Sequence, residues 1–170
     1  MLGVALGRLE REGSVRVDAK IPADDPLWTD TGIPWDGAVE VQLSVSFAGT
    51  GEIVSRGRVT GPLRQECRRC LQPVKGVFDE EVTIVFVASD AIEGEDAGEA
   101  RIFDPTAGEL DLGDAVREEV LLAVNQYVVC DTECKGLCPK CGANLNEEVC
   151  TCADEELDPR WEALRALKDK

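Results

Sequence analysis

The 170-residue chain contains no histidine, and this absence alone removes several classes of enzyme. A Ser-His-Asp triad, a Cys–His pair and a catalytic metal held by histidines all require an imidazole. Cations are also scarce, since 18 lysines and arginines stand against 34 aspartates and glutamates, for a formal charge of −16. So acidic a chain is not expected to bind polyanions generically, because contact with phosphate needs clustered cations.

Long apolar runs are missing as well. No run approaches the ~20 residues of a membrane span. Residues 1–12 lack the charged, apolar and small-residue order of a signal peptide. We therefore expect a cytoplasmic protein with neither a membrane partner nor a small-molecule substrate. In that compartment, paired disulfides are not the default state of cysteines.

Four stretches alternate between apolar and polar residues, as half-buried strands do. They are residues 13–21, 38–47, 52–59 and 77–87, and the third continues through Leu63 towards Cys67. The connections are short and rich in turn-forming residues, as at Gly49–Gly51. This pattern favours a meander of antiparallel strands, and it predicts a curved sheet or an incomplete barrel.

One long helix is predicted to cover this sheet. Asp111 is a suitable N-cap for a helix from Leu112 to about Tyr127. Apolar residues recur at four-residue spacing along it, at Leu112, Val116, Val120 and Val124, and form a face that can lie on the sheet. Pro159 begins a second, short helix near the end of the chain.

The predicted fold class is therefore α+β. It consists of an antiparallel, curved or barrel-like sheet packed by one long helix, with a C-terminal zinc-ribbon-like tail and a short terminal helix. We expect a sheet and helix domain over residues 1–129 and a cysteine-rich zinc tail over residues 130–170. The tail would join the main domain through Cys67 and Cys70.

The eight cysteines form four close pairs, Cys67/Cys70, Cys130/Cys134, Cys138/Cys141 and Cys150/Cys152. Four thiolates surround Zn²⁺ tetrahedrally, and two cysteines two to four residues apart supply two ligands from one turn. The economical assignment is two structural Zn²⁺ sites. The first two pairs would tie the sheet to the end of the long helix, and the last two would form a local ribbon in the tail.

Three other interpretations of the cysteines rank below structural zinc. Disulfides need an oxidising compartment. A thioredoxin-type C-x-x-C needs a helix N-terminus in a βαβ unit, which the pattern does not predict. An iron–sulfur cluster uses the same four thiolates, so iron stays open as the occupant. A catalytic zinc would keep an open position, whereas complete sets of four indicate closed sites.

These motifs resemble those of the YceD family, the large ribosomal RNA subunit accumulation proteins. The resemblance rests on Cys67-Arg-Arg-Cys70-Leu71, the acid-capped helix, the run from Cys134 to Asn146, Cys150-Thr-Cys152, and Asp158-Pro-Arg160-Trp-Glu-Ala-Leu164. It implies a role in the accumulation of large-subunit (23S) ribosomal RNA and in assembly of that subunit. It implies no catalytic residues, and we expect a protein that is not an enzyme.

Six cations lie within twenty residues, and Glu66 is the only acid among them. They are Arg56, Arg58, Arg64, Arg68, Arg69 and Lys75. One interpretation is a solvated strand surface, and the other is an RNA-binding segment, because arginine pairs well with phosphate and a metal turn holds it rigidly. Neither Arg68 nor Arg69 is a predicted ligand, so reversing both charges is expected to spare the metals.

Acidic residues form two blocks, at 90–99 and 147–158. Solvated spacers are the simpler interpretation. The alternative is a nucleic-acid mimic that shields a basic protein before assembly. The sequence therefore carries two functional hypotheses. The first is a zinc-containing factor that contacts large-subunit ribosomal RNA, and the second is an acidic chaperone or adaptor for a basic large-subunit ribosomal protein.

Overall fold

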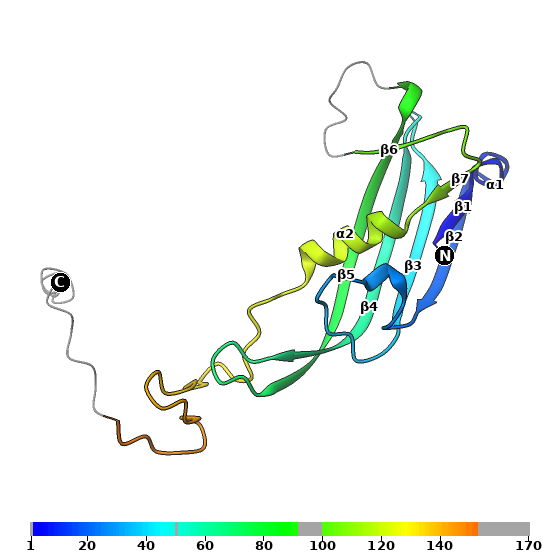
Figure 1. Cartoon of the computed structure of the whole chain (residues 1–170). Helices are drawn as coiled ribbons and strands as arrows, with labels where there is room; N and C mark the ends of the chain where they lie inside the picture. Colours follow the sequence, from blue (N-terminus) through cyan, green and yellow to red (C-terminus); the bar gives the residue numbers. More distant parts are fainter. Residues whose placement is uncertain (1, 50, 92–99, 153–170) are drawn as a thin grey trace, which may run out of the picture.

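The computed structural model describes residues 2–49, 51–91 and 100–152. Its centre is a five-stranded sheet in the order β2-β3-β4-β5-β6 (Figure 1). The strands are β2 (Ser14–Ile21), β3 (Val39–Phe47), β4 (Ile53–Glu66), β5 (Pro73–Ala88) and β6 (Arg101–Phe103). The first four pair antiparallel in chain order, while β6 runs parallel to β5. The predicted meander is therefore confirmed, β4 continues to the cysteine turn as expected, and β5 begins four residues earlier than the alternation indicated.

The barrel-like closure expected from the sequence is wrong. β2 and β6 lie at opposite edges of the sheet, which stays open. Other elements bury the inner face instead of a closing strand. Figure 1 shows α2 (Gly113–Ala123) lying across that face, beside a small two-stranded sheet of β1 (Gly3–Ala5) and β7 (Glu109–Asp111).

The inner face carries the apolar half of each alternation. Val39, Val41, Leu43 and Val45 of β3 are all buried, and they pack in one core with Val116 and Val120 of α2. Trp28, in the short 3-10 helix η1 (Pro26–Trp28), is buried in the same core, where Trp35 packs against it. Both tryptophans thus cover the core, and the polar half of each strand faces solvent.

The helix α2 is shorter than predicted, with 11 residues. It begins one residue later than expected, with Leu112 and not Asp111 at the N-cap position, although Asp111 Oδ1 accepts a hydrogen bond from the Gly113 N–H at 2.8 Å. It ends early because Val124 has an extended backbone conformation and Asn125 Oδ1 accepts from the Tyr127 N–H, which forms a turn. The chain is thereby free to turn back towards the sheet.

Sequence patterns did not reveal the N-terminal elements. The helix α1 (Leu6–Glu12) follows β1 directly and ends at Gly13, whose φ of 73° suits only glycine well. A second 3-10 turn, η2 (Ser89–Ala91), follows β5. The short helix expected from Pro159 and most of the acidic block at 90–99 lie outside the described residues. In the described part, no helix has the length and apolarity that crossing a membrane requires.

Candidate metal centre

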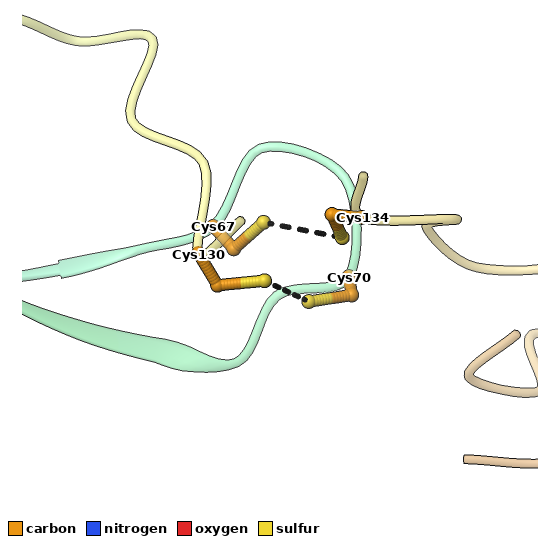
Figure 2. A group of neighbouring side chains, drawn as sticks. All are labelled: Cys67, Cys70, Cys130 and Cys134. Atoms are coloured by element: carbon orange, nitrogen blue, oxygen red, sulfur yellow. Dashed lines mark hydrogen bonds between the residues drawn. The ribbon is translucent and has the colours of Figure 1, made fainter. Parts of the chain in front are cut away.

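The β4–β5 hairpin ends in a cysteine turn. The Cys67 N–H donates to the Gln72 carbonyl at 2.9 Å, and the Leu71 N–H donates to the Cys67 carbonyl at 2.9 Å. Leu71 has a φ of 60°, an uncommon conformation for a branched side chain. The turn points the Cys67 and Cys70 side chains towards a common centre (Figure 2).

The segment after α2 returns to this tip and brings the second cysteine pair with it. Gln65 Nε2 donates to the Asn125 carbonyl at 2.7 Å, and the Arg68 N–H donates to the Val128 carbonyl at 2.9 Å. These bonds join residues about 60 positions apart. The chain that follows therefore delivers Cys130 and Cys134 to the hairpin.

The first group comprises Cys67, Cys70, Cys130 and Cys134, the set expected from the spacing. Its sulfurs all lie within 4.8 Å of one another, with 3.8 Å between Cys67 and Cys134 and 3.5 Å between Cys70 and Cys130 (Figure 2). A tetrahedral site with Zn–S bonds of about 2.3 Å separates its sulfurs by about 3.8 Å. The donor set and its spacing therefore fit a tetrahedral metal ion.

Hydrogen bonds to sulfur support this fit. The Arg69 N–H donates to Cys67 Sγ at 3.4 Å, and Asn146 Nδ2 donates to Cys134 Sγ at 3.4 Å. Such donors orient thiolates and offset their charge. Three of the four cysteines are buried, and Cys130 is exposed.

The second group comprises Cys138, Cys141, Cys150 and Cys152, again the set expected from the spacing. Cys150 Sγ lies 3.3 Å from Cys138 Sγ and 3.6 Å from Cys141 Sγ. Gly142 closes the first turn with a φ of 75°, and its N–H donates to the Cys138 carbonyl. Only Cys138 is buried here, so this group is the more solvent-accessible of the two.

The two groups are tied together by contacts that the sequence patterns did not predict. The Leu137 N–H donates to the Arg69 carbonyl at 3.0 Å. Gly136 has a φ of 78°, and a Cβ there would lie 3.0 Å from the same carbonyl oxygen. Asn146, from the second segment, bonds both Cys134 Sγ and the Lys135 N–H. In the sequence, the only signals of this link were a glycine, Gly136, and an asparagine, Asn146, among the cysteines.

Close packing of four thiols shifts their pKa values in opposite directions. Burial raises the pKa of Cys67, but backbone donors at Cys130, Cys70 and Arg69 outweigh it and lower that pKa to about 6. The Cys134 and Cys70 side chains raise the pKa of Cys130 to about 12. In the second group, backbone N–H groups of Cys141 and Lys140 lower the pKa of Cys138 to about 6. The Cys150 and Cys141 side chains raise the pKa of Cys152 to about 12.

The six cations differ in their surroundings. Arg58 forms ion pairs with Asp79 and Glu81 at 2.9 and 3.0 Å. Arg68 Nε donates to the Gln126 carbonyl at 2.8 Å, and Arg69 Nη1 donates to the Cys134 carbonyl at 2.9 Å. The other three, Arg56, Arg64 and Lys75, are exposed and make no side-chain hydrogen bond or ion pair with other described residues.

Comparison with known proteins identifies a matching family model and similar proteins. The family model described as "Large ribosomal RNA subunit accumulation protein YceD" matches residues 55–168. Uncharacterized proteins of Mycobacterium bovis and Mycobacterium tuberculosis are each 34% identical over 129 residues, which is 74% of this chain and 60% of theirs. The chain thus spans about 60% of the length of these relatives.

A plant relative carries the family's functional name. The chloroplastic "Large ribosomal RNA subunit accumulation protein YCED homolog 1" of Arabidopsis thaliana is 40% identical over 68 residues, covering 40% of this chain and 21% of its own. No solved structure matches the chain.

Proposed function

The chain belongs to the YceD family, and from this premise we propose that it is a zinc-containing assembly factor for the large ribosomal subunit. In this proposal it supports accumulation of 23S ribosomal RNA in the cytoplasm by contacting RNA with the tip of the β4–β5 hairpin. The family's description names an accumulation role and no catalytic activity. We define the hairpin tip as residues 62–77, the end of β4, the cysteine turn and the start of β5.

The proposal assigns a structural role to metal. Cys67, Cys70, Cys130 and Cys134 would hold one Zn²⁺, and Cys138, Cys141, Cys150 and Cys152 a second. Zinc in such closed sites supplies folding free energy and leaves no open coordination position. In the first site it would fix the segment after α2 to the hairpin tip. We also propose that the chain divides near residues 129 and 130, with the two units joined through Cys67 and Cys70.

One observation in particular supports the proposed RNA contact. Arg64 and Lys75 stand directly opposite each other in the β4–β5 ladder. Like charges at such positions destabilise a sheet, because their Cβ atoms are about 5 Å apart. Both side chains are exposed, and neither has a carboxylate partner among the described residues. A phosphate between them would replace this repulsion with attraction.

The six predicted RNA-binding residues do not contribute equally in this proposal. The two ion pairs of Arg58 reduce its attraction for phosphate. Arg68 and Arg69 use part of their donor capacity on backbone carbonyls. Arg64 and Lys75, which lie in the hairpin tip, are therefore the main phosphate contacts, whereas Arg56 is unpaired but lies outside the tip.

The test measures binding of the purified, zinc-loaded chain to fragments of 23S ribosomal RNA at several salt concentrations. Arg64→Glu with Lys75→Glu should weaken binding and lower the log–log salt slope by roughly 0.7 or more for each phosphate that is no longer bound. The matched control is Arg8→Glu with Arg11→Glu on α1. It makes the same change in net charge at positions more than 50 residues before the hairpin tip. It should bind nearly as the parent does. Equal weakening in both variants would contradict the assignment to the hairpin tip.

A second candidate function rests on the formal charge of −16. Such a chain could act as an acidic chaperone or adaptor for a basic large-subunit ribosomal protein. Restoration of large-subunit RNA by variants expressed in cells distinguishes the two functions. If the hairpin variant restores large-subunit RNA in cells lacking the protein, while neutralising Asp154, Glu155 and Glu156 does not, the adaptor function replaces RNA contact.

A further inference from the structure

A groove of about 570 Å³ lies beside the hairpin tip. One wall is the loop at residues 31–34, the second is the end of β4, and the third is the end of α2 with the chain just beyond it. Ile33, Pro34, Leu121 and Val124 supply apolar surface. The charged residues that line it are Arg64, Arg68 and Glu66, two cations and one acid.

An exposed aromatic ring adjoins this groove. Tyr127 is 76% exposed, and the guanidinium carbon of Arg68 lies 5.0 Å from the centre of its ring. This is the geometry of a cation–π pair. Arg68 belongs to both features, because it lines the groove and stacks on the ring.

The backbone that carries this exposed ring is held in place by hydrogen bonds. The Tyr127 N–H donates to Asn125 Oδ1 at 2.8 Å. Its neighbours Gln126 and Val128 each accept a hydrogen bond from Arg68, through the side chain and the backbone N–H respectively. Trp28 and Trp35, by contrast, pack in or against the core. A ring on a backbone that is already ordered loses less entropy when a flat ligand stacks on it than one on a free segment would.

We propose that Tyr127 and this groove form a subsite for an unpaired RNA nucleotide. The base stacks on the free face of the Tyr127 ring, and Arg64 and Arg68 meet the adjoining phosphates. Proteins commonly recognise single-stranded RNA in this way, with aromatic rings and arginine planes stacking on splayed bases. The subsite rests on the proposed RNA contact and specifies its substrate as single-stranded RNA.

Selectivity follows from the chemistry of stacking. In a duplex each base already stacks on its neighbours. A single exposed ring can therefore stack on a duplex base only if that base is first unstacked, which costs free energy. A basic strand surface alone would attract both forms through their phosphates. The subsite therefore predicts tighter binding to an unstructured strand than to a duplex of equal length.

The experiment compares the zinc-loaded full chain with Tyr127→Ala and Tyr127→Phe, using an unstructured oligouridine and a duplex RNA of the same length. Tyr127→Ala should weaken binding to oligouridine at least about fivefold, whereas Tyr127→Phe should stay close to the parent. The salt slope of Tyr127→Ala should be unchanged, because no cation is removed. Leu122→Ala, at an 81% exposed position on α2, is the matched control for removal of exposed apolar surface. Zinc content and thermal unfolding verify the fold of each variant.

Crosslinking supplies an independent readout. Oligouridine carrying 4-thiouridine, irradiated on the parent chain, should give an adduct on Tyr127 or on residues lining the groove. If the parent binds RNA but Tyr127→Ala binds it equally well, the subsite is wrong and the proposed function stands. Weakened binding in both Tyr127→Ala and Tyr127→Phe would also reject stacking. If the parent binds no RNA, both proposals fail, and a basic protein retained by the parent but not by Tyr127→Ala would assign the groove to a protein partner.

Discussion

The guanidinium of Arg69 donates a hydrogen bond of 2.9 Å to the carbonyl of Cys134. A side chain between two cysteines of the hairpin thus holds the backbone of a cysteine more than 60 residues later. The same nitrogen lies 3.3 Å from the Thr132 carbonyl. Arg69 therefore clamps the segment that completes the first cysteine group.

This clamp changes an expectation drawn from the sequence. Because neither Arg68 nor Arg69 is a ligand, reversing both charges was expected to spare the metals. The structure predicts instead that Arg69→Glu weakens zinc retention at the first group, since a carboxylate would face carbonyl oxygens. Competition with a chelator measures this. Arg64→Glu, which removes no side-chain hydrogen bond to another described residue, is the control and should retain zinc as the parent does.

The metal content should be two zinc ions per chain, one for each cysteine group. Metal analysis of the purified chain checks this. Replacing both Cys138 and Cys141 by serine should halve the zinc and leave the first group filled. Iron in place of zinc, with the visible absorption of an iron–sulfur cluster, would contradict the choice of metal.

Cys67→Ser should destabilise the fold more than Cys152→Ser. Cys67 is fully buried and belongs to the group that closes a long loop, whereas Cys152 is exposed and closes a local one. We expect the two variants to differ in free energy of unfolding by more than about 1 kcal/mol, and for a chain of this size each 1 kcal/mol shifts Tm by roughly 2–4 °C. Thermal unfolding in the presence of zinc measures it, and an equal or reversed order would disprove the assigned roles.

Asn146→Ala should lower metal affinity at the first group, although Asn146 lies beyond Cys141 in the chain. Its side chain donates to Cys134 Sγ and accepts from the Lys135 N–H. Removal of such an outer partner typically costs about 10–100-fold in affinity. Glu148→Ala, at an exposed neighbouring position, is the control. If only the second group released its metal, the link between the groups would be rejected.

Much of the sheet could be predicted because its information is local. Alternation of valines with polar residues marks β3, and the same rule located β2, β4 and β5. Cysteine spacing likewise predicted both groups that the structure assembles. The strands β1 and β7 have three residues each, too few to show a period, and they exist because they pair with each other.

The remaining differences arise from contacts between distant parts of the chain. Beyond the local turn that ends α2 at Ala123, Asn125 and Gln126 bond to Gln65 and Arg68, and no local pattern records these contacts. The same applies to the basic residues. The six cations cannot be distinguished from the sequence by whether they are ion-paired. Asp79 and Glu81 reach Arg58 only because β4 pairs with β5. Which charges stay unpaired is a property of the assembled sheet.

The long separation within the first cysteine group also has a consequence in time. A ribosome adds about 5–20 residues per second, and Cys134 follows Cys70 by some 64 residues. Several seconds therefore pass during which Cys67 and Cys70 are made but have no partners. Metal cannot close this group until α2 has been synthesised and the segment beyond it has reached the hairpin. Capture of the proposed metal would thus be a late event of biosynthesis, and a chain stalled before Cys130 would carry a bare thiol pair exposed to oxidants.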